Sequence, residues 1–229
     1  MDQNKLKRIS QHAKKVDFWT MKFCYFFSIR LVALVEHTFL TPDHLTWGSI
    51  FLCLLGAVLI FLYPGNYWWQ LAAGILFQTS YILDCADGQL ARYKQQFSEN
   101  GWRLDLYSDR VKEYAILISM TYAFISYRNW GWVVGMTAMG VLSLQKYLRA
   151  HEILKSTLFT VNRSRKISNV EKVYRHKARL GRIKEFKKKY NLGMMYIGEF
   201  YLFNLVFIIV GRLECFFYTI IIYGLFSIW

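Results

Sequence analysis

Six apolar stretches, each close to the length of a membrane-spanning helix, are the strongest constraint on how this chain can fold. A helix that crosses a bilayer needs about 20 mainly apolar residues. The stretches cover residues 45–63, 67–83, 111–127, 132–148, 194–210 and 213–228. Turn residues separate neighbouring stretches, for example Pro64-Gly65-Asn66 between the first and the second. The sequence therefore predicts an all-α integral membrane protein with six transmembrane helices.

A further apolar stretch, residues 18–40, precedes the first predicted span and is interrupted by Lys22, Arg30, Glu36 and His37. Charges within an otherwise apolar helix are typical of an amphipathic helix that lies in the membrane interface. We therefore expect an interfacial helix before the six spans, and a seventh span is the alternative.

Positive charge alternates with the apolar stretches along the chain. The formal net charge is +14, and most Lys and Arg fall in the N-terminal segment, in the loop after Arg92 and in residues 146–189. Six spans with both termini in the cytoplasm place all three segments on the cytoplasmic side, in agreement with the positive-inside rule. The opposite loops are short and are flanked by Trp and Tyr, which are enriched at membrane interfaces. The sequence thus predicts a multi-pass protein with a basic cytoplasmic face.

The same positive charge would also suit a nucleic-acid-binding protein, but the sequence contains no helix-turn-helix, zinc-finger or RNA-binding signature. Membrane lipids with anionic head groups fit better, because each Lys or Arg near the surface contributes about 1 kcal/mol. No cleaved signal peptide is expected, since the basic N-terminus lacks a short apolar run before a cleavage site. The four cysteines, Cys24, Cys53, Cys85 and Cys215, are widely spaced and form no CxxC pair, so they indicate neither a zinc site nor a disulfide framework.

We expect a single membrane domain over residues 1–229. Residues 1–44 form a cytoplasmic or interfacial segment, and residues 45–154 contain the first four spans. A basic insertion at 155–191 either forms helices on the membrane surface or lacks fixed structure, and the sequence does not decide between them. Residues 192–229 contain the last two spans.

Four aspartates occur where the second stretch ends and the third begins. Asp84 and Asp87 are three residues apart, and Asp105 and Asp109 are four apart, so each pair shares one face of a helix. The short link at 93–100 makes the two helices antiparallel neighbours, which allows all four carboxylates to converge. Carboxylates are unfavourable in a membrane, by roughly 2.5–3.5 kcal/mol each at mid-bilayer, and they repel one another. A divalent cation removes both problems.

Aspartates at a helix end can also lie in head-group water without binding anything. Four of them at paired helical spacing, with Gly88, Arg92 and Gly101 among them, favour a metal site instead. Ligands that are all oxygen favour Mg²⁺ or Mn²⁺ over zinc. Two such ions about 3.5–4 Å apart would suit a displacement at phosphorus.

The motif that contains these aspartates resembles the signature of the CDP-alcohol phosphotransferase family, also called CDP-alcohol phosphatidyltransferases. It reads Asp-x-x-Asp-Gly-x-x-Ala-Arg at 84–92, then eight residues, then Gly-x-x-x-Asp-x-x-x-Asp at 101–109. Every specified position of the signature is present at the family's spacing. Residues 42–46 also resemble the Pro-Asn-x-x-Thr start of the family's first span, with Asp43 where Asn is usual.

The resemblance implies a metal-dependent membrane enzyme of phospholipid biosynthesis, with its active site at the cytoplasmic face. It would transfer a phospho-alcohol group from a CDP-alcohol donor to a hydroxyl acceptor and release CMP. The implied metal ligands are Asp84, Asp87, Asp105 and Asp109, and Asp109 is also the implied general base. Residues implied at the nucleotide or pyrophosphate are Gly88, Ala91, Arg92 and Gly101. Homodimers are usual in the family.

Basic residues near the end of the fourth span contact a phosphorylated acceptor in related enzymes. The residues of this chain in that region are Lys146 and Arg149. The alternative is that both side chains extend to the membrane interface without binding an acceptor.

The resemblance leaves the donor open. One branch of the family uses CDP-diacylglycerol and a small polar alcohol, and the other uses a water-soluble CDP-alcohol with diacylglycerol or a polyol phosphate. Small size and six spans favour the first branch by analogy. Two other classes remain as alternatives. A cation channel or transporter would spread its acids over several spans, and a scaffold that binds through the basic insertion would leave the aspartates unexplained.

Overall fold

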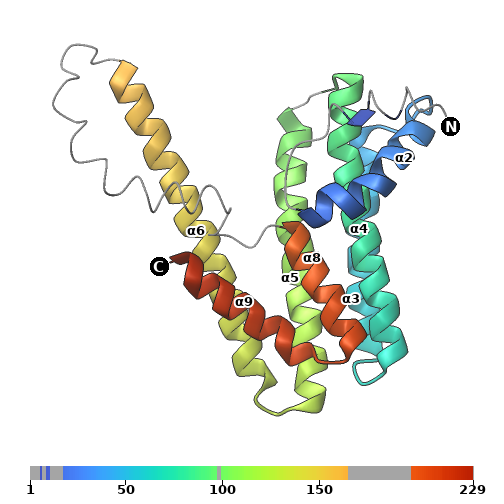
Figure 1. Ribbon diagram of the computed structural model, residues 1–229, viewed down its shortest axis with the longest axis vertical. Helices are drawn as coiled ribbons and strands as arrows, with labels where there is room; N and C mark the ends of the chain where they lie inside the picture. Colours follow the sequence, from blue (N-terminus) through green and yellow to red (C-terminus); the bar gives the residue numbers. More distant parts are fainter. Residues whose placement is uncertain (1–5, 7–8, 11–17, 97–98, 165–196, 229) are drawn as a thin grey trace. The chain divides into compact units, whose positions relative to one another are not determined.

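The structure is a computed structural model that describes residues 6, 9–10, 18–96, 99–164 and 197–228. Within these residues it contains helices and no strands (Figure 1), which confirms the all-α prediction. The chain divides into two units, Met1–Met136 with Tyr196–Phe217 and Thr137–Met195 with Tyr218–Trp229. The segment boundaries expected from the sequence stay a prediction.

The first unit holds the aspartate motif on helices that run alongside one another (Figure 1). Its helices are η1 Thr20–Cys24, α2 Tyr25–Val35, α3 Pro42–Leu62, α4 Tyr67–Lys94, α5 Glu99–Tyr127 and α8 Ile197–Val210. α3 packs against both α4 and α5, and α4 also packs against α2 and α8. α4, which carries half of the motif, therefore has neighbours on several sides.

Side-chain caps define where α3 and α4 begin. At the start of α3, the hydroxyl of Thr41 accepts from the His44 amide at 3.4 Å, and His44 Nδ1 accepts from the Thr41 amide at 3.1 Å. Pro42 occupies the first helical position, where its missing amide hydrogen has no partner to lose. At the start of α4, Asn66 Oδ1 accepts from two backbone amides at 3.0 and 3.4 Å. The turn that ends the first predicted span therefore also starts the next helix.

α3 and α4 approach closely at Gly56. A Cβ atom at this position would lie 2.8 Å from Cε1 of Phe77 and 3.2 Å from the carbonyl oxygen of Ala73. Farther along the same interface, the Ser80 hydroxyl donates to the carbonyl oxygen of Ser49 at 2.7 Å. The close contact brings the polar side chains of α3 next to the motif on α4.

Among the described helices, α3 alone is long and apolar enough to cross a membrane. The apolar helices Ile197–Val210 and Leu213–Leu225 are shorter. α4 buries Gln70, Gln78 and Ser80 within its apolar half, and these polar side chains lower its hydropathy. The structure thus supports the first predicted span, whereas the count of six spans stays a prediction.

The N-terminal helix, residues 18–35 with η1 and α2, has two unlike faces. One face is buried and bonds to α4: the Thr20 and Tyr81 hydroxyls lie 2.7 Å apart, and Ser28 donates to Gln89 at 3.1 Å. The other face exposes large hydrophobic side chains, namely Phe18, Met21, Phe23, Phe26 and Phe27. This pattern fits an amphipathic helix, and its position in a membrane interface stays a prediction.

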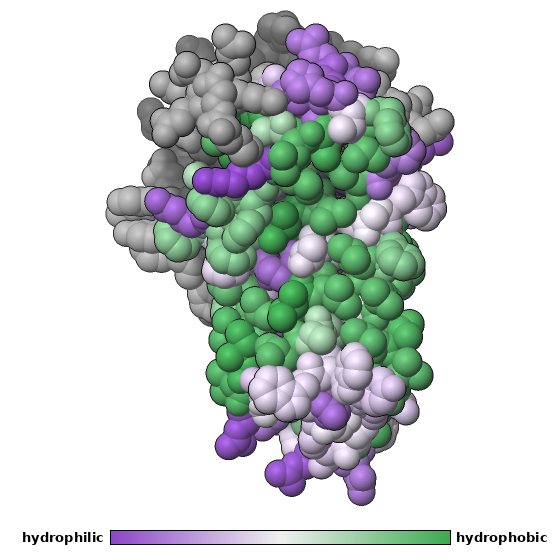
Figure 2. Space-filling model, turned by 90° about the vertical axis from the view of Figure 1, so that its right-hand side faces the viewer, coloured by the Kyte–Doolittle hydropathy of each residue, from purple (hydrophilic) through white to green (hydrophobic). Residues whose placement is uncertain are grey.

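Exposed hydrophobic side chains are abundant on α3 as well. They are Trp47, Phe51, Leu54, Leu55, Val58, Phe61 and Leu62. Figure 2 shows hydrophobic residues in a broad band on one face of the molecule, with hydrophilic residues at both ends of the band. Large exposed apolar areas mark surfaces that contact a membrane or another protein.

α6 Gly131–Ser164 and α9 Leu213–Ile228 continue from the first unit into the second. Within the second unit, Gly224 on α9 lies against Val141 on α6, where a Cβ atom would clash. α6 remains helical beyond residue 154, where the sequence suggested the start of the basic insertion. The remainder of that insertion, residues 165–191, lies outside the described residues.

Candidate active site

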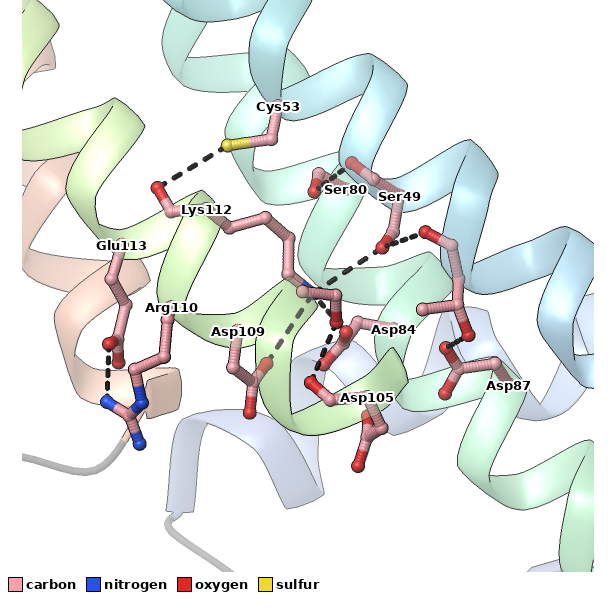
Figure 3. A network of polar contacts seen from close by, with 12 residues as sticks. Ser49, Cys53, Ser80, Asp84, Asp87, Asp105, Asp109, Arg110, Lys112 and Glu113 are labelled. Carbon is pink, nitrogen blue, oxygen red and sulfur yellow. Dashed lines mark hydrogen bonds and ion pairs between the residues drawn. The ribbon is translucent and has the colours of Figure 1, made fainter. Parts of the chain in front are cut away.

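The predicted aspartates lie together where the motif-bearing ends of α4 and α5 meet. One carboxylate oxygen from each of Asp84, Asp87 and Asp105 lies within 4.8 Å of the others. Asp109 is outside this group of three but pairs with the same lysine as Asp84, the buried Lys112 (Figure 3). The structure therefore brings all four residues into one site, three as a ligand group and the fourth through Lys112.

Asp87 is the most buried of the four, with 5% of its surface exposed. Its Oδ2 atom accepts a hydrogen bond of 2.5 Å from the Thr46 hydroxyl on α3. Burial, followed by the negative charge of Asp84, raises the pKa of Asp87 well above its ordinary value. Asp87 lies beyond the second predicted span. A nearby divalent cation would favour the charged carboxylate and so lower this pKa.

Asp109 has the environment of a base. Burial, followed by the charge of Asp84, raises the pKa of Asp109 to about 7, and the charge of Lys112 opposes this shift. A cation bound by the neighbouring carboxylates would act in the same direction as Lys112. A carboxylate with a raised pKa holds a proton more firmly once it has accepted one, which suits general-base catalysis.

Lys112 belongs to the site, although the sequence left open whether it balances the charge of the aspartates or contacts lipid head groups. Its side chain is almost fully buried, and its ammonium group pairs with Asp84 and lies 3.5 Å from Oδ1 of Asp109. The spacing held a signal, because Asp105, Asp109 and Lys112 follow one another at intervals of four and three residues. Such residues share one face of a helix. The partner on α3, Ser49, shows no comparable pattern in the sequence.

The guanidinium group of Arg92 lies next to Gly88, and both residues were predicted at the nucleotide. A Cβ atom on Gly88 would lie 3.3 Å from Nη1 of Arg92, so glycine makes room for the guanidinium group over the α4 backbone. Ala91 and Gly101 are half-buried at the same end of the two helices. Arg110, a further flanking cation, pairs with the buried Glu113 at 2.8 Å. The contacts of Gly88, Ala91, Arg92 and Gly101 with a nucleotide stay a prediction.

The two predicted acceptor residues are on α6 in the second unit. Lys146 is half-buried, and the side chain of Arg149 lies outside the described part of the chain. Their role stays a prediction.

The chemistry of the ligand group suits a hard divalent cation. Asp84, Asp87 and Asp105 offer only carboxylate oxygens, which Mg²⁺ and Mn²⁺ prefer and which soft metals do not. The hydrogen bond from Thr46 to Asp87 is the kind of outer contact that orients a metal ligand. The residues present therefore fit the ion that the sequence predicts.

An all-α fold with broad exposed apolar surfaces and a cluster of carboxylates suited to divalent cations fits a metal-dependent membrane protein. The sequence model of the CDP-alcohol phosphatidyltransferase family matches residues 39–220, and the chain belongs to this family. This match confirms the resemblance inferred from the motif. It identifies the chain as a transferase that moves a phospho-alcohol group from a CDP-alcohol, in a family whose members are typically embedded in membranes. A search of curated proteins finds no significant match.

Proposed function

We propose that this chain transfers a phosphatidyl group from CDP-diacylglycerol to the hydroxyl of a small polar alcohol and releases CMP, as a step of phospholipid biosynthesis. The observation that carries the proposal is the cluster of three carboxylates from Asp84, Asp87 and Asp105. Asp109 is joined to this cluster through Lys112. A site of this kind is suited to bind a pyrophosphate through divalent cations and to remove a proton beside it.

The three grouped aspartates would hold Mg²⁺ or Mn²⁺, and Asp109 would contribute to the same site. We propose that the site holds two such ions, which would supply positive charge for the pyrophosphate and for the leaving CMP. Thr46 orients Asp87 through its hydrogen bond. The chain thereby supplies both the ligands and the contact that holds one of them in place.

Asp109 would act as the general base and accept the proton of the acceptor hydroxyl. The hydroxyl oxygen then forms a bond to the phosphorus of the phosphatidyl group. The bond from that phosphorus to the bridging oxygen breaks, and CMP leaves with this oxygen. The place of Asp109 beside the ligand group, where it pairs with the same Lys112 as Asp84, supports this assignment.

Nucleotide binding would fall to Arg92 with the small residues around it. The guanidinium group of Arg92 lies over Gly88, and a planar cation is well suited to a phosphate. Ala91 would leave the nucleotide space near the helix, and Gly101 on α5 would allow close packing of the helices. Lys146 and Arg149 are proposed to bind a phosphate on the acceptor.

The surface beside the aspartates supports a lipid donor. On α5, Leu106, Tyr107 and Val111 are all more than 40% exposed, at 45%, 68% and 46%. They occur in the same turns as Asp105 and Asp109, where the acyl chains of CDP-diacylglycerol could lie against them. A diacylglycerol acceptor would use the same surface, so the comparison of donors is what separates the two branches.

We further propose six spans with both termini in the cytoplasm and the active site at the cytoplasmic face. At the α3–α4 turn, which is the end remote from the aspartates, the exposed side chains include Tyr63, Tyr67, Trp68 and Trp69. Trp and Tyr belong at the membrane interface, so this turn would mark the opposite face. The N-terminal helix would lie in the cytoplasmic interface with its exposed Phe side chains toward lipid, and a homodimer is proposed as in other family members.

The proposal is tested by CMP release from purified protein with Mg²⁺, with CDP-diacylglycerol and soluble CDP-alcohols as separate donors and pooled polar and lipid acceptors. We expect CMP from CDP-diacylglycerol, and no CMP from the Asp109→Asn variant. CMP from a soluble donor alone would replace the proposed donor. No CMP from any donor, with folded protein that binds Mn²⁺, would contradict the proposed reaction.

A further inference from the structure

Lys112 connects three helices of the first unit through its ammonium group. The group pairs with Asp84 on α4, lies 3.5 Å from Oδ1 of Asp109 on its own helix α5, and donates to Ser49 Oγ on α3 at 3.4 Å. Figure 3 shows the Lys112 side chain extended between α5 and the other two helices, with its ammonium group among these partners. An ammonium group has three hydrogens to donate, and the structure supplies three partners.

The position of Lys112 is unusual for a lysine. Its surface is 1% exposed, although Lys is almost never fully buried unless it is paired. Removing a cation from water is unfavourable unless opposite charges and hydrogen bonds compensate for it. Here the compensation comes from Asp84 and Asp109, two of the carboxylates that the proposed reaction uses.

Ser49 holds the ammonium group from the α3 side, and Ser80 on α4 bonds to Ser49. The Ser49 hydroxyl donates to the Thr46 carbonyl oxygen at 2.8 Å, which leaves its own oxygen free to accept from Lys112. The Ser49 carbonyl oxygen in turn accepts from the Ser80 hydroxyl at 2.7 Å. Lys112 is therefore attached to a network that runs from α3 to α4, and the carboxylates bound to it share that support.

We propose that Lys112 is a positioning residue of the metal site: it holds Asp84 and Asp109 from the interior of the helix bundle and thereby maintains the arrangement in which the aspartates bind a divalent cation. This inference rests on the proposed metal-dependent function. It assigns Lys112 no contact with substrate and no part in proton transfer. Outer contacts of this kind commonly change metal affinity by about 10–100-fold when they are removed.

A purely electrostatic role for Lys112 predicts a change in metal affinity of the opposite sign. If the ammonium group acted only as a positive charge near the site, its removal would strengthen the attraction of a divalent cation. If it positions the carboxylates, its removal weakens binding. The direction of the change in metal affinity therefore separates the two roles.

The test is Mn²⁺ binding to the purified full chain in detergent, measured by calorimetry and by the electron paramagnetic resonance signal of free and bound Mn²⁺. Lys112→Met keeps the length of the side chain and removes the ammonium group. We expect it to raise the Mn²⁺ dissociation constant by about 10-fold or more and to alter the spectrum of the bound ion. An unchanged or lower dissociation constant would overturn the inference.

A second variant and a control keep the test decisive if Lys112→Met does not fold. Ser49→Ala removes the α3 contact but keeps the lysine, and we expect a weaker change in the same direction. Arg110→Gln is the matched control, because it removes a cation from the same turn of α5 but keeps a donor for Glu113, and Mn²⁺ binding should stay at the wild-type level. If Ser49→Ala bound Mn²⁺ as tightly as the wild type, the proposed support from α3 would be wrong.

Failure of this inference is distinguishable from failure of the proposed function. Wild-type protein that binds no Mn²⁺ would contradict the metal site itself and the inference with it. Wild-type protein and Lys112→Met that bind Mn²⁺ equally would contradict the inference alone.

Discussion

The hydroxyl of Thr46 on α3 lies 2.5 Å from Oδ2 of Asp87 on α4, as the donor of a hydrogen bond between residues 41 positions apart. Thr46 belongs to the segment that starts the first predicted span, whereas Asp87 belongs to the aspartate motif. The two segments that resemble the family signature therefore meet in space. Since Asp87 is buried, its carboxylate depends on this donor more than an exposed one would.

Replacing Thr46 by Val should weaken the site, because Val keeps the shape of the side chain but cannot donate to Asp87. We expect the Mn²⁺ dissociation constant to rise about 10-fold and the free energy of unfolding to fall by about 1–3 kcal/mol, which is typical for an unsatisfied buried acceptor. Thr46→Ser retains the hydroxyl and should bind Mn²⁺ nearly as the wild type does. Equal affinities for the Val and Ser variants, measured by calorimetry, would contradict the assigned role of the hydrogen bond.

Asp109→Asn should lower the rate of CMP release by at least about 100-fold, because general-base catalysis contributes about 10²–10⁴-fold. Binding of CDP-diacylglycerol should be largely retained, since the ligand group of Asp84, Asp87 and Asp105 is intact. Asp87→Asn should lose metal binding as well as turnover. The control is Glu214→Gln, which changes a partly exposed carboxylate paired with Arg212. Near-normal CMP release from Asp109→Asn would show that another group is the base.

Removal of divalent cations with EDTA should stop CMP release and lower the unfolding temperature. The four carboxylates then repel one another, and Lys112 offsets this repulsion only in part through its pairing with Asp84 and Asp109. When the free ion concentration is 100 times the dissociation constant, binding stabilises a protein by about 2.7 kcal/mol. Thermal unfolding with and without Mg²⁺ measures this difference. Full activity and an unchanged unfolding temperature in EDTA would contradict a metal-dependent reaction.

Gly56→Ala should destabilise the protein by about 1–3 kcal/mol, the usual range for inserting a methyl group into a tightly packed interface. The added Cβ atom would lie 2.8 Å from Cε1 of Phe77 and would push α3 away from α4. Gly140→Ala is the matched control in a helix, because a Cβ atom there meets nothing within 4 Å. It should be neutral or stabilise by up to about 1 kcal/mol. Equal unfolding temperatures for the two variants would show that α3 and α4 tolerate a wider separation.

Local patterns were sufficient to predict the helical class, the aspartate site and the family. Asp84, Asp87, Asp105 and Asp109 are close in sequence, and their spacing of three and four residues sets each pair on one helical face. A short connection between two helices makes them neighbours. The convergence of the four carboxylates follows from these local facts, which is why the sequence could predict it.

The tertiary structure decided which other residues serve the site. Lys112 lies 28 positions from Asp84 and 63 from Ser49, yet it contacts both. From the sequence alone, Lys112 and Arg110 could not be told apart, because both are cations next to the motif. The two differ because the packing of α3 on α4 and α5 buries one of them against the aspartates and directs the other to Glu113. Burial depends on the contacts of a whole helix face, so spacing within a single helix could not separate the two cations.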